Sequence, residues 1–320
     1  MQKTKILFHS LVSLIIVSIC LLYFINKSDN GFSINHIFHA IQIGWFYLLI
    51  ACVLLIVSVY LRAVRWRLLF DSDHDTLNPK FLFHSQLIGY FINNIFPIRI
   101  GDFARSYVVS KKTNYSNSYI LGTILMERFL DILMILFFCM ILIWNYGLQY
   151  FQFSVSFQLY AMLIIIIFIV SYLIYRSIIF IPQKIQNIFI QLWDGFTGIQ
   201  SASVGLVFLL SGLIWFIYCS NVFLIQKIFQ FDLNMLDCML LLVGASFLQM
   251  IPTGFASAGI FHLGVSGILE NQLSKINTEN FVFTLFLYSY VVYTTLGGYY
   301  FISKGKVTIQ NLYKDITKTS

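Results

Sequence analysis

Residues 93–106 have the sequence NNIFPIRIGDFARS, which places a proline, two arginines and an aspartate inside a long apolar region. The segment 80–112 around it has 17 residues before Pro97 and 15 after it. A helix rises about 1.5 Å per residue and a proline breaks it, so each arm is marginal for crossing about 30 Å of hydrocarbon. We therefore predict a re-entrant helical hairpin over 80–112, surrounded by protein or a watery cavity.

The rest of the chain has the composition of a polytopic membrane protein. Hydrophobic residues make up 59% of the 320 residues, charged residues make up 10%, and the mean hydropathy is +0.82. These values lie far outside those of soluble domains. Lipid offers the backbone no hydrogen-bond partners, so we predict an all-α fold with about six full transmembrane helices. The windows long and apolar enough to cross are 6–25, 42–61, 118–146, 158–181, 203–226 and 280–302.

The segment 233–268 repeats the pattern of the first hairpin. Gly244 lies eight residues before Pro252, as Gly89 lies eight residues before Pro97. We predict a second re-entrant hairpin here, in which small residues let backbones approach closely. The expected hinge positions of the two hairpins are Pro97, Gly101, Pro252, Gly254 and Gly259.

The hairpins and the flanking windows recur at similar offsets, which indicates an internal repeat. The two units are residues 1–150 and 151–320, and their paired spans are expected to run in opposite directions. Such inverted repeats are typical of secondary transporters, which hold their site near the midplane between the units. Chance similarity among hydrophobic segments is the alternative.

Basic residues gather on one expected side of the membrane. With the N-terminus in the cytoplasm, 16 of the 20 lysines and arginines lie on that side; Lys27, Lys227 and Lys275 lie outside, and Arg128 is embedded. The positive-inside rule therefore predicts a cytoplasmic-membrane protein with both termini in the cytoplasm. Residues 182–200 have apolar side chains at helical spacing, which predicts a helix along the cytoplasmic interface.

The stretch LRAVRWRLLF, residues 61–70, ends the second window with three arginines and a tryptophan. Arginine reaches toward headgroups and tryptophan prefers the interface, so the stretch has the composition of an interfacial anchor. A specific headgroup site that includes Arg65 is an equally weighted interpretation.

In the opening motif, Asp102 can pair with Arg99 or Arg105, each three residues away. One guanidinium would then be left for a phosphate or carboxylate, which its planar fork binds through two parallel donors. A self-satisfied cytoplasmic loop is the alternative.

The stretch MERFLDIL, residues 126–133, places charges inside a span. Glu127 lies about 14 Å deep at helical rise and Asp131 one turn deeper. Each would cost about 2.5 to 3.5 kcal/mol in hydrocarbon, so both must face a partner or a cavity. Arg128 can reach Asp131, and the remaining negative charge is expected to attract arginines of the opening motif. This network either locks the hairpin structurally or serves as a gate.

No motif for familiar enzyme chemistry is present. A phosphate-binding loop, a GxSxG elbow and an HExxH motif are all missing from the sequence, and the five cysteines are scattered singly. Residues 71–75, DSDHD, could hold a divalent cation, but a solvated loop is favoured. We expect neither an enzyme nor a cofactor or metal site. Nucleic acid is not an expected partner, because basic residues in membrane proteins mainly set orientation.

The chain resembles the transmembrane, flippase-like region of lysylphosphatidylglycerol synthases and its stand-alone membrane relatives. The matching pieces are RAVRW at 62–66, NNIFPIRIGDFAR at 93–105, ERFLD at 127–131 and a weaker segment around Pro252 and Gly259. The resemblance implies movement of a lipid across the bilayer, or handling of a lipid-linked intermediate.

Two departures from the family pattern qualify what the resemblance implies. The family's Pro-Gly-Gly run and its later glutamate are replaced here by Phe255, Ala256 and Ser257, and by His262. The soluble aminoacyl-transferase domain of the full-length synthases does not follow the last span, so lipid aminoacylation is not implied.

We therefore predict a lipid translocase without ATP hydrolysis, whose two units enclose a water-accessible pocket for an anionic phospholipid or lipid-linked saccharide headgroup. Glu127 and His262 are the candidate proton carriers, and the sequence leaves a monomer and a homo-oligomer equally open. The alternatives are a secondary transporter of a small anion, a lipid-modifying enzyme, or a non-catalytic membrane subunit of glycolipid or polymer synthesis. The expected headgroup-binding residues are Arg65, Asn94, Arg99, Asp102, Arg105, Glu127, Arg128 and Asp131.

Overall fold

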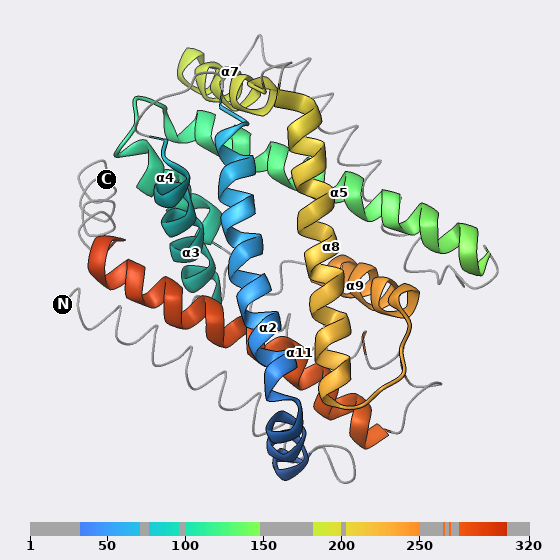
Figure 1. The fold of residues 1–320 in the computed structure, drawn as a ribbon. Helices are drawn as coiled ribbons and strands as arrows, with labels where there is room; N and C mark the ends of the chain where they lie inside the picture. The colour runs from blue at the N-terminus through green and yellow to red at the C-terminus, as the bar shows by residue number, and fades with distance from the viewer. Residues whose placement is uncertain are drawn as a thin grey trace.

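The described part of the chain is folded into α-helices. The computed structural model describes residues 33–70, 77–95, 100–147, 182–199, 203–249, 265, 269 and 275–305 (Figure 1). The helices are α2 (Ile34–Arg67), α3 (Pro79–Ile95), α4 (Gly101–Ser110), α5 (Asn117–Tyr146), α7 (Gln183–Thr197), α8 (Val204–Ile228), α9 (Met235–Gln249) and α11 (Lys275–Tyr300), which a π-helical turn, Phe301–Gly305, follows. The predicted all-helical fold is confirmed for this part of the chain.

Four helices in the described part are long and apolar enough to cross a membrane. They are Ile34–Arg67, Asn117–Tyr146, Val204–Ile228 and Thr278–Ser303. They correspond to four of the six predicted windows, which confirms a multi-pass membrane protein. The other two windows, 6–25 and 158–181, lie outside the described residues.

Helices α3 and α4 fold back on one another as a hairpin. A Cβ on Gly101 would collide with the carbonyl oxygen of Gly89, so only glycine permits this approach. The backbone N–H of Gly101 also donates to Asn93 Oδ1 at 2.7 Å. The two arms are thus held together close to their turn, where Pro97 and Arg99 lie outside the described residues.

Helices α2 and α8 lie side by side and run antiparallel (Figure 1). A Cβ on Gly44, in the first half of α2, would lie 2.8 Å from the Cα of Ile228 at the end of α8. At the opposite end, Arg65 of α2 donates to Ser211 near the start of α8. Helix α2 departs from helical geometry at Gly44, where φ is −100° and ψ is 18°.

Helix α11 packs antiparallel on α3 and supports the hairpin from one side. The ring of His84 stacks on Tyr300 with centroids 4.0 Å apart. Near the other end of the contact, Asn94 Nδ2 donates to Thr294 Oγ1 at 3.0 Å. Gly297 lies between these contacts, with no room for a Cβ against the α3 backbone.

Helix α7 packs across the beginning of α5 (Figure 1). A Cβ on Gly195 would collide with the carbonyl oxygen of Tyr119, and a Cβ on Gly122 would collide with that of Leu192. Apolar side chains of α7 that stay exposed are Ile185, Ile188, Phe189, Ile190 and Trp193. Such a helix has the features of one that lies in a membrane interface.

Helix α9 is the first arm of the second predicted hairpin. Cys238 and Leu241 of α9 are buried in a core shared with α2, α8 and α11. The turn and hinge residues expected to follow it lie outside the described residues: Pro252, Gly254, Gly259 and His262.

Candidate functional site

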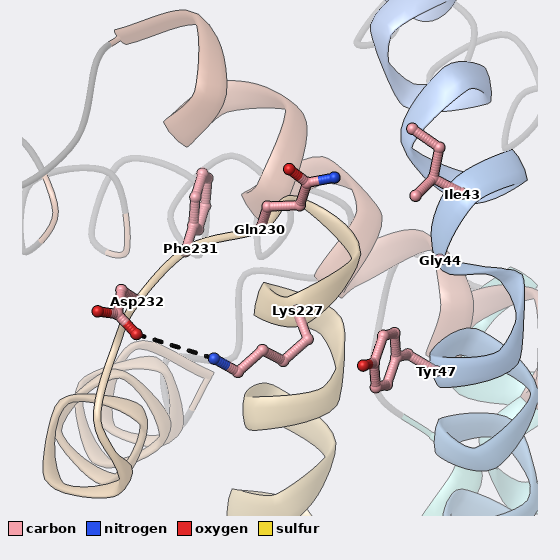
Figure 2. A pocket seen from close by; sticks show the side chains of 7 residues that line it. All are labelled: Ile43, Gly44, Tyr47, Lys227, Gln230, Phe231 and Asp232. Atoms are coloured by element: carbon pink, nitrogen blue, oxygen red, sulfur yellow. Dashed lines mark ion pairs between the residues drawn. The ribbon is translucent and has the colours of Figure 1, made fainter.

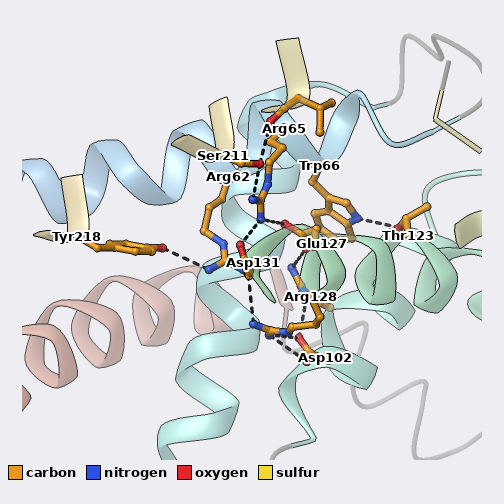
Figure 3. Close-up of polar contacts among 12 residues, drawn as sticks. Arg62, Arg65, Trp66, Asp102, Thr123, Glu127, Arg128, Asp131, Ser211 and Tyr218 are labelled. Carbon is orange, nitrogen blue, oxygen red and sulfur yellow. Dashed lines mark hydrogen bonds and ion pairs between the residues drawn. The ribbon is translucent and has the colours of Figure 1, made fainter. Parts of the chain in front are cut away.

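Seven charged side chains from three helices form one connected set of ion pairs, which we call the charge network (Figure 3). They are Arg62 and Arg65 of α2, Asp102 and Arg105 of α4, and Glu127, Arg128 and Asp131 of α5. Residues three or four positions apart share one face of a helix, and each helix contributes a pair at this spacing. The packing of α2 and α4 on α5 brings these three faces together.

The inner end of the charge network is buried. Glu127 has no exposed surface; its Oε2 lies 2.8 Å from Arg105 Nη1, and its Oε1 lies 3.7 Å from Arg65 Nη2. The side chains of Arg65 and Arg105 are 0% and 3% exposed. A buried carboxylate without partners would be strongly destabilising, so these two arginines are what allows a glutamate in this apolar setting.

The indole ring of Trp66 closes one side of the inner end. The guanidinium carbon of Arg105 lies 4.8 Å from the ring centroid, which is a cation–π distance. The Trp66 Nε1–H donates to Thr123 Oγ1 at 2.9 Å. Trp66 and Arg65 are fully buried and Arg62 is 7% exposed, so the interpretation of these three residues as an interfacial anchor is wrong.

Asp131 joins the inner end to helix α8. Its Oδ1 lies 3.0 Å from Arg65 Nη2, and its Oδ2 lies 3.4 Å from Arg62 Nη2. The same two arginines donate to α8, Arg65 to Ser211 Oγ at 2.9 Å and Arg62 to Tyr218 Oη at 3.3 Å. Two hydroxyl groups of α8 therefore complete the polar surroundings of the network.

The outer end of the charge network is accessible. The side chains of Asp102 and Arg128 are 34% and 44% exposed, and Arg128 Nη2 lies 3.1 and 3.3 Å from the two carboxylate oxygens of Asp102. Arg105 Nε also donates to Asp102 at 3.0 Å, which confirms one of the two pairings considered for Asp102. Arg128 lies 4.0 Å from Asp131, the other predicted pair. Asp102 is thus held by one buried and one accessible arginine.

The charge network carries more positive than negative charge. Four guanidinium groups face three carboxylates, a formal excess of one positive charge over the described residues. Within that part of the chain, Arg62 Nε, Arg65 Nε and Arg105 Nη2 are buried and donate no hydrogen bond. An unsatisfied buried donor costs about 1 to 3 kcal/mol. The network therefore has the charge to accept one further anionic group, and its accessible guanidinium group is that of Arg128 at the outer end.

The water-accessible pocket expected around the deep charges is not found at the inner end. Glu127 and Arg65 have no exposed surface and contact their charged partners directly. Most exposed surface of the network is at the outer end, and the side chains of Asp131 and Arg62 are 14% and 8% exposed. The carboxylate of Glu127 is compensated by direct ion pairs there, because guanidinium groups from α2 and α4 reach it.

One predicted headgroup ligand, Asn94, lies outside the charge network. Asn94 contacts α11, where its Nδ2 donates to Thr294 Oγ1 and lies 3.4 Å from the carbonyl oxygen of Tyr290. Its amide docks the hairpin on α11 rather than facing the network. Arg99 is not among the described residues.

The DSDHD loop at 71–75 lies outside the described residues. Among the residues that are described, no group of three His, Cys, Asp or Glu side chains is arranged to hold a metal ion. A cavity of about 430 Å³ is found instead at the other end of α2, between Tyr47 and Lys227 (Figure 2). It shares no lining residue with the charge network.

Four contributors to the site were not predicted as functional residues: Arg62, Trp66, Ser211 and Tyr218. The spacing of Arg62, Arg65 and Trp66 on one helix face matches that of Glu127 and Asp131, and this match is the signal that could have found the first two. Single hydroxyl groups inside the apolar span of α8 give no such signal.

All seven residues of the charge network fall within three of the quoted motifs, RAVRW, NNIFPIRIGDFAR and ERFLD. A known protein family matches the part of the chain that contains these three motifs. Residues 10–297 match the family described as the lysylphosphatidylglycerol synthase TM region.

Two archaeal proteins are similar to this chain. The UPF0104 membrane protein MJ1078 of Methanocaldococcus jannaschii is 27% identical over 211 residues, which cover 64% of this chain and 89% of that protein. The UPF0104 membrane protein MJ1595 of the same organism is 28% identical over 132 residues, 39% of each chain. No solved structure gives a significant match. The family match extends over most of the sequence and includes every residue of the charge network, and the chain therefore belongs to the lysylphosphatidylglycerol synthase transmembrane-region family.

Proposed function

We propose that the chain is a lipid translocase of the flippase type. It would move an anionic phospholipid or lipid-linked saccharide headgroup across the cytoplasmic membrane without ATP hydrolysis. The observation that carries this proposal is the excess guanidinium charge of the network, which among the described residues is most exposed at the end formed by Asp102 and Arg128. A phosphate group supplies the negative charge that the network lacks, and it offers the guanidinium group of Arg128 paired acceptors that can replace Asp102.

The ion pair between Asp102 and Arg128 provides the entry step of this mechanism. An anionic headgroup that reaches Arg128 competes with Asp102 for the same guanidinium donors. When Asp102 is displaced, α4 loses its accessible link to α5, while Arg105 stays bound to Glu127. The headgroup is then shielded between the hairpin and α5, and the acyl chains stay in the lipid.

The proposed architecture has six full spans and two re-entrant hairpins, arranged as inverted units 1–150 and 151–320 with both termini in the cytoplasm. The contacts from α8, in the second unit, to Arg62 and Arg65, in the first, support a site between the units. Secondary transporters with inverted repeats bind their substrates at this kind of interface. Net transport would then follow the lipid gradient or the flow of a coupled ion.

A second candidate function is a non-catalytic membrane subunit of glycolipid or polymer synthesis. The observation that favours it is the lack of solvent-exposed surface at the inner end, where the side chains of Arg65 and Glu127 are both 0% exposed. Buried pairs of this kind can fix one conformation of a fold rather than bind a ligand. In that case the network would lock the hairpin permanently on α5.

Reconstituted proteoliposomes separate these candidates. The measurement is the initial rate at which a labelled anionic lipid changes leaflet, for wild type, Arg128→Gln and Lys111→Gln at equal folded amounts. Lys111 is the matched control, because it lies just after α4 and outside the charge network. We expect Arg128→Gln to slow movement at least about tenfold, since charged hydrogen bonds contribute about 1.5 to 3 kcal/mol, and Lys111→Gln to retain the rate.

Three results would contradict the translocase. They are a wild-type rate equal to that of empty vesicles, equal rates for both variants, and uptake of a soluble phosphate ester without any lipid movement. The last result would instead favour transport of a small anion.

A further inference from the structure

We propose that a cavity at the open end of the α3–α4 hairpin binds the phosphate group of an anionic membrane lipid. The cavity has a volume of about 280 Å³ and is lined by residues of the first half of α3 and the end of α4. It shares no lining residue with the charge network. The proposal is therefore independent of the transport function.

The cavity is apolar at its floor and basic at its rim. Ile88 and Val108 are 2% and 6% exposed and form the floor together with the buried Ser85. Lys80 and Lys112 are exposed at the rim, one at the start of α3 and the other just after α4. This gradient fits a ligand that has a charged group joined to an apolar body.

Neighbouring groups contact the ammonium group of Lys112 and the backbone of Lys80. The Lys112 Nζ lies 4.7 Å from the ring centroid of Phe81, a cation–π contact that restrains the ammonium group. The backbone N–H of Lys80 donates to Asn78 Oδ1 at 2.9 Å, in the first turn of α3. The dipole of α3, whose N-terminus lies at this edge, adds further positive potential.

The positive charge of this cavity is uncompensated within the described part of the chain. No acidic residue lines the cavity, and no described carboxylate forms an ion pair with Lys80 or Lys112. The cavity in Figure 2 differs in this respect, because Lys227 there lies 3.9 Å from Asp232 Oδ1. An anion is therefore favoured at the hairpin and not at the cavity beside α8.

A lipid fits this site better than a free anion does. The chain is a membrane protein, and basic pockets between membrane helices bind the headgroups of anionic lipids. The aliphatic stems of the lysines can follow the apolar surface while their ammonium groups meet the phosphate. A phosphate held by Lys80 and Lys112 would bridge the two arms of the hairpin, next to the point where His84 stacks on Tyr300 of α11.

Native mass spectrometry of the full chain in detergent tests this site. Phosphatidylglycerol, phosphatidylcholine and inorganic phosphate are titrated separately, in an Arg128→Gln background that weakens anion binding at the charge network. The variants are Lys80→Gln with Lys112→Gln, the charge-retaining Lys80→Arg with Lys112→Arg, and the control Lys111→Gln. Lys111 has the same charge and adjoins Lys112, but it does not line the cavity.

We expect phosphatidylglycerol to bind the parent chain about tenfold more tightly than phosphatidylcholine, and the double glutamine variant to lose that preference. The double arginine variant and Lys111→Gln should keep it. Equal binding by the double glutamine variant, or an equal loss in Lys111→Gln, would overturn the site. Binding of inorganic phosphate with no preference for the anionic lipid would overturn the lipid as its ligand. None of these outcomes depends on whether the chain moves lipids.

Discussion

Arg105 Nη1 lies 2.8 Å from Glu127 Oε2, and neither side chain is more than 3% exposed. This ion pair connects the hairpin arm α4 to the long helix α5. Both charges are away from solvent, so each depends on the other for compensation. Loss of one partner therefore has a larger effect than loss of an exposed ion pair.

Replacement of Glu127 tests how much this ion pair contributes to the free energy of unfolding. We expect Glu127→Ala to lower the free energy of unfolding by about 3 to 5 kcal/mol, because the buried guanidinium groups of Arg65 and Arg105 each lose one of their two carboxylate partners. Arg105→Met combined with Glu127→Met should be much less destabilising, since it removes both charges together. Unfolding titrations in mixed detergent micelles measure both. A double variant less stable than Glu127→Ala would contradict the pairing.

The close approach of the hairpin arms makes Gly101 intolerant of a side chain. We expect Gly101→Ala to destabilise the protein by about 1 to 3 kcal/mol, because the added Cβ meets the backbone of Gly89. Gly212→Ala in α8 is the matched control, since nothing lies within 4 Å of its Cβ position. That change should be neutral, or stabilising by up to about 1 kcal/mol from helix propensity. Similar thermal stability of the two variants would show that the hairpin arms are farther apart.

Trp66 combines a hydrogen bond with a contact to Arg105. We expect Trp66→Phe to cost at least about 0.5 to 1.5 kcal/mol, because it removes the N–H that bonds to Thr123 and leaves a smaller ring under the guanidinium group. Trp144→Phe is the control, because Trp144 is 89% exposed. Thermal unfolding followed by the protection of buried cysteines measures both. An effect of Trp144→Phe as large as that of Trp66→Phe would argue against a buried role for Trp66.

Much of the fold could be predicted from the lengths of the apolar segments and from the position of one proline. Windows such as 42–61 and 203–226 correspond to helices because lipid leaves the backbone no other partner. The hairpin followed from Pro97 and the short arms beside it, and the contact of Gly89 with Gly101 confirms that the chain turns back there. Pairings within one helix, such as Asp102 with Arg105, followed from spacing alone.

The contacts between helices could not be predicted in the same way. Arg62 and Arg65 end an apolar span, and the same composition suits an interfacial anchor or a buried ligand of carboxylates. Only the crossing of α2 over α5 decides between them, and sequence periodicity does not contain the position of that crossing. Ser211 likewise gains its role from the antiparallel packing of α8 on α2, which brings it to Arg65 at 2.9 Å.

We propose that the ion pair between Asp102 and Arg128 is an entry site for an anion and not only a structural contact between α4 and α5. If the ion pair is only structural, Asp102→Asn and Arg128→Gln should change lipid binding in the same direction, because each substitution breaks the same ion pair. An entry site predicts opposite directions, since Asp102→Asn removes the competitor for Arg128 and Arg128→Gln removes the ligand.

The most direct measurement is the dissociation constant of a labelled anionic lipid for these two variants and wild type in nanodiscs. We expect Asp102→Asn to bind at least about threefold more tightly than wild type, and Arg128→Gln about tenfold more weakly. Weaker binding by both variants, or no change in either, would contradict the account.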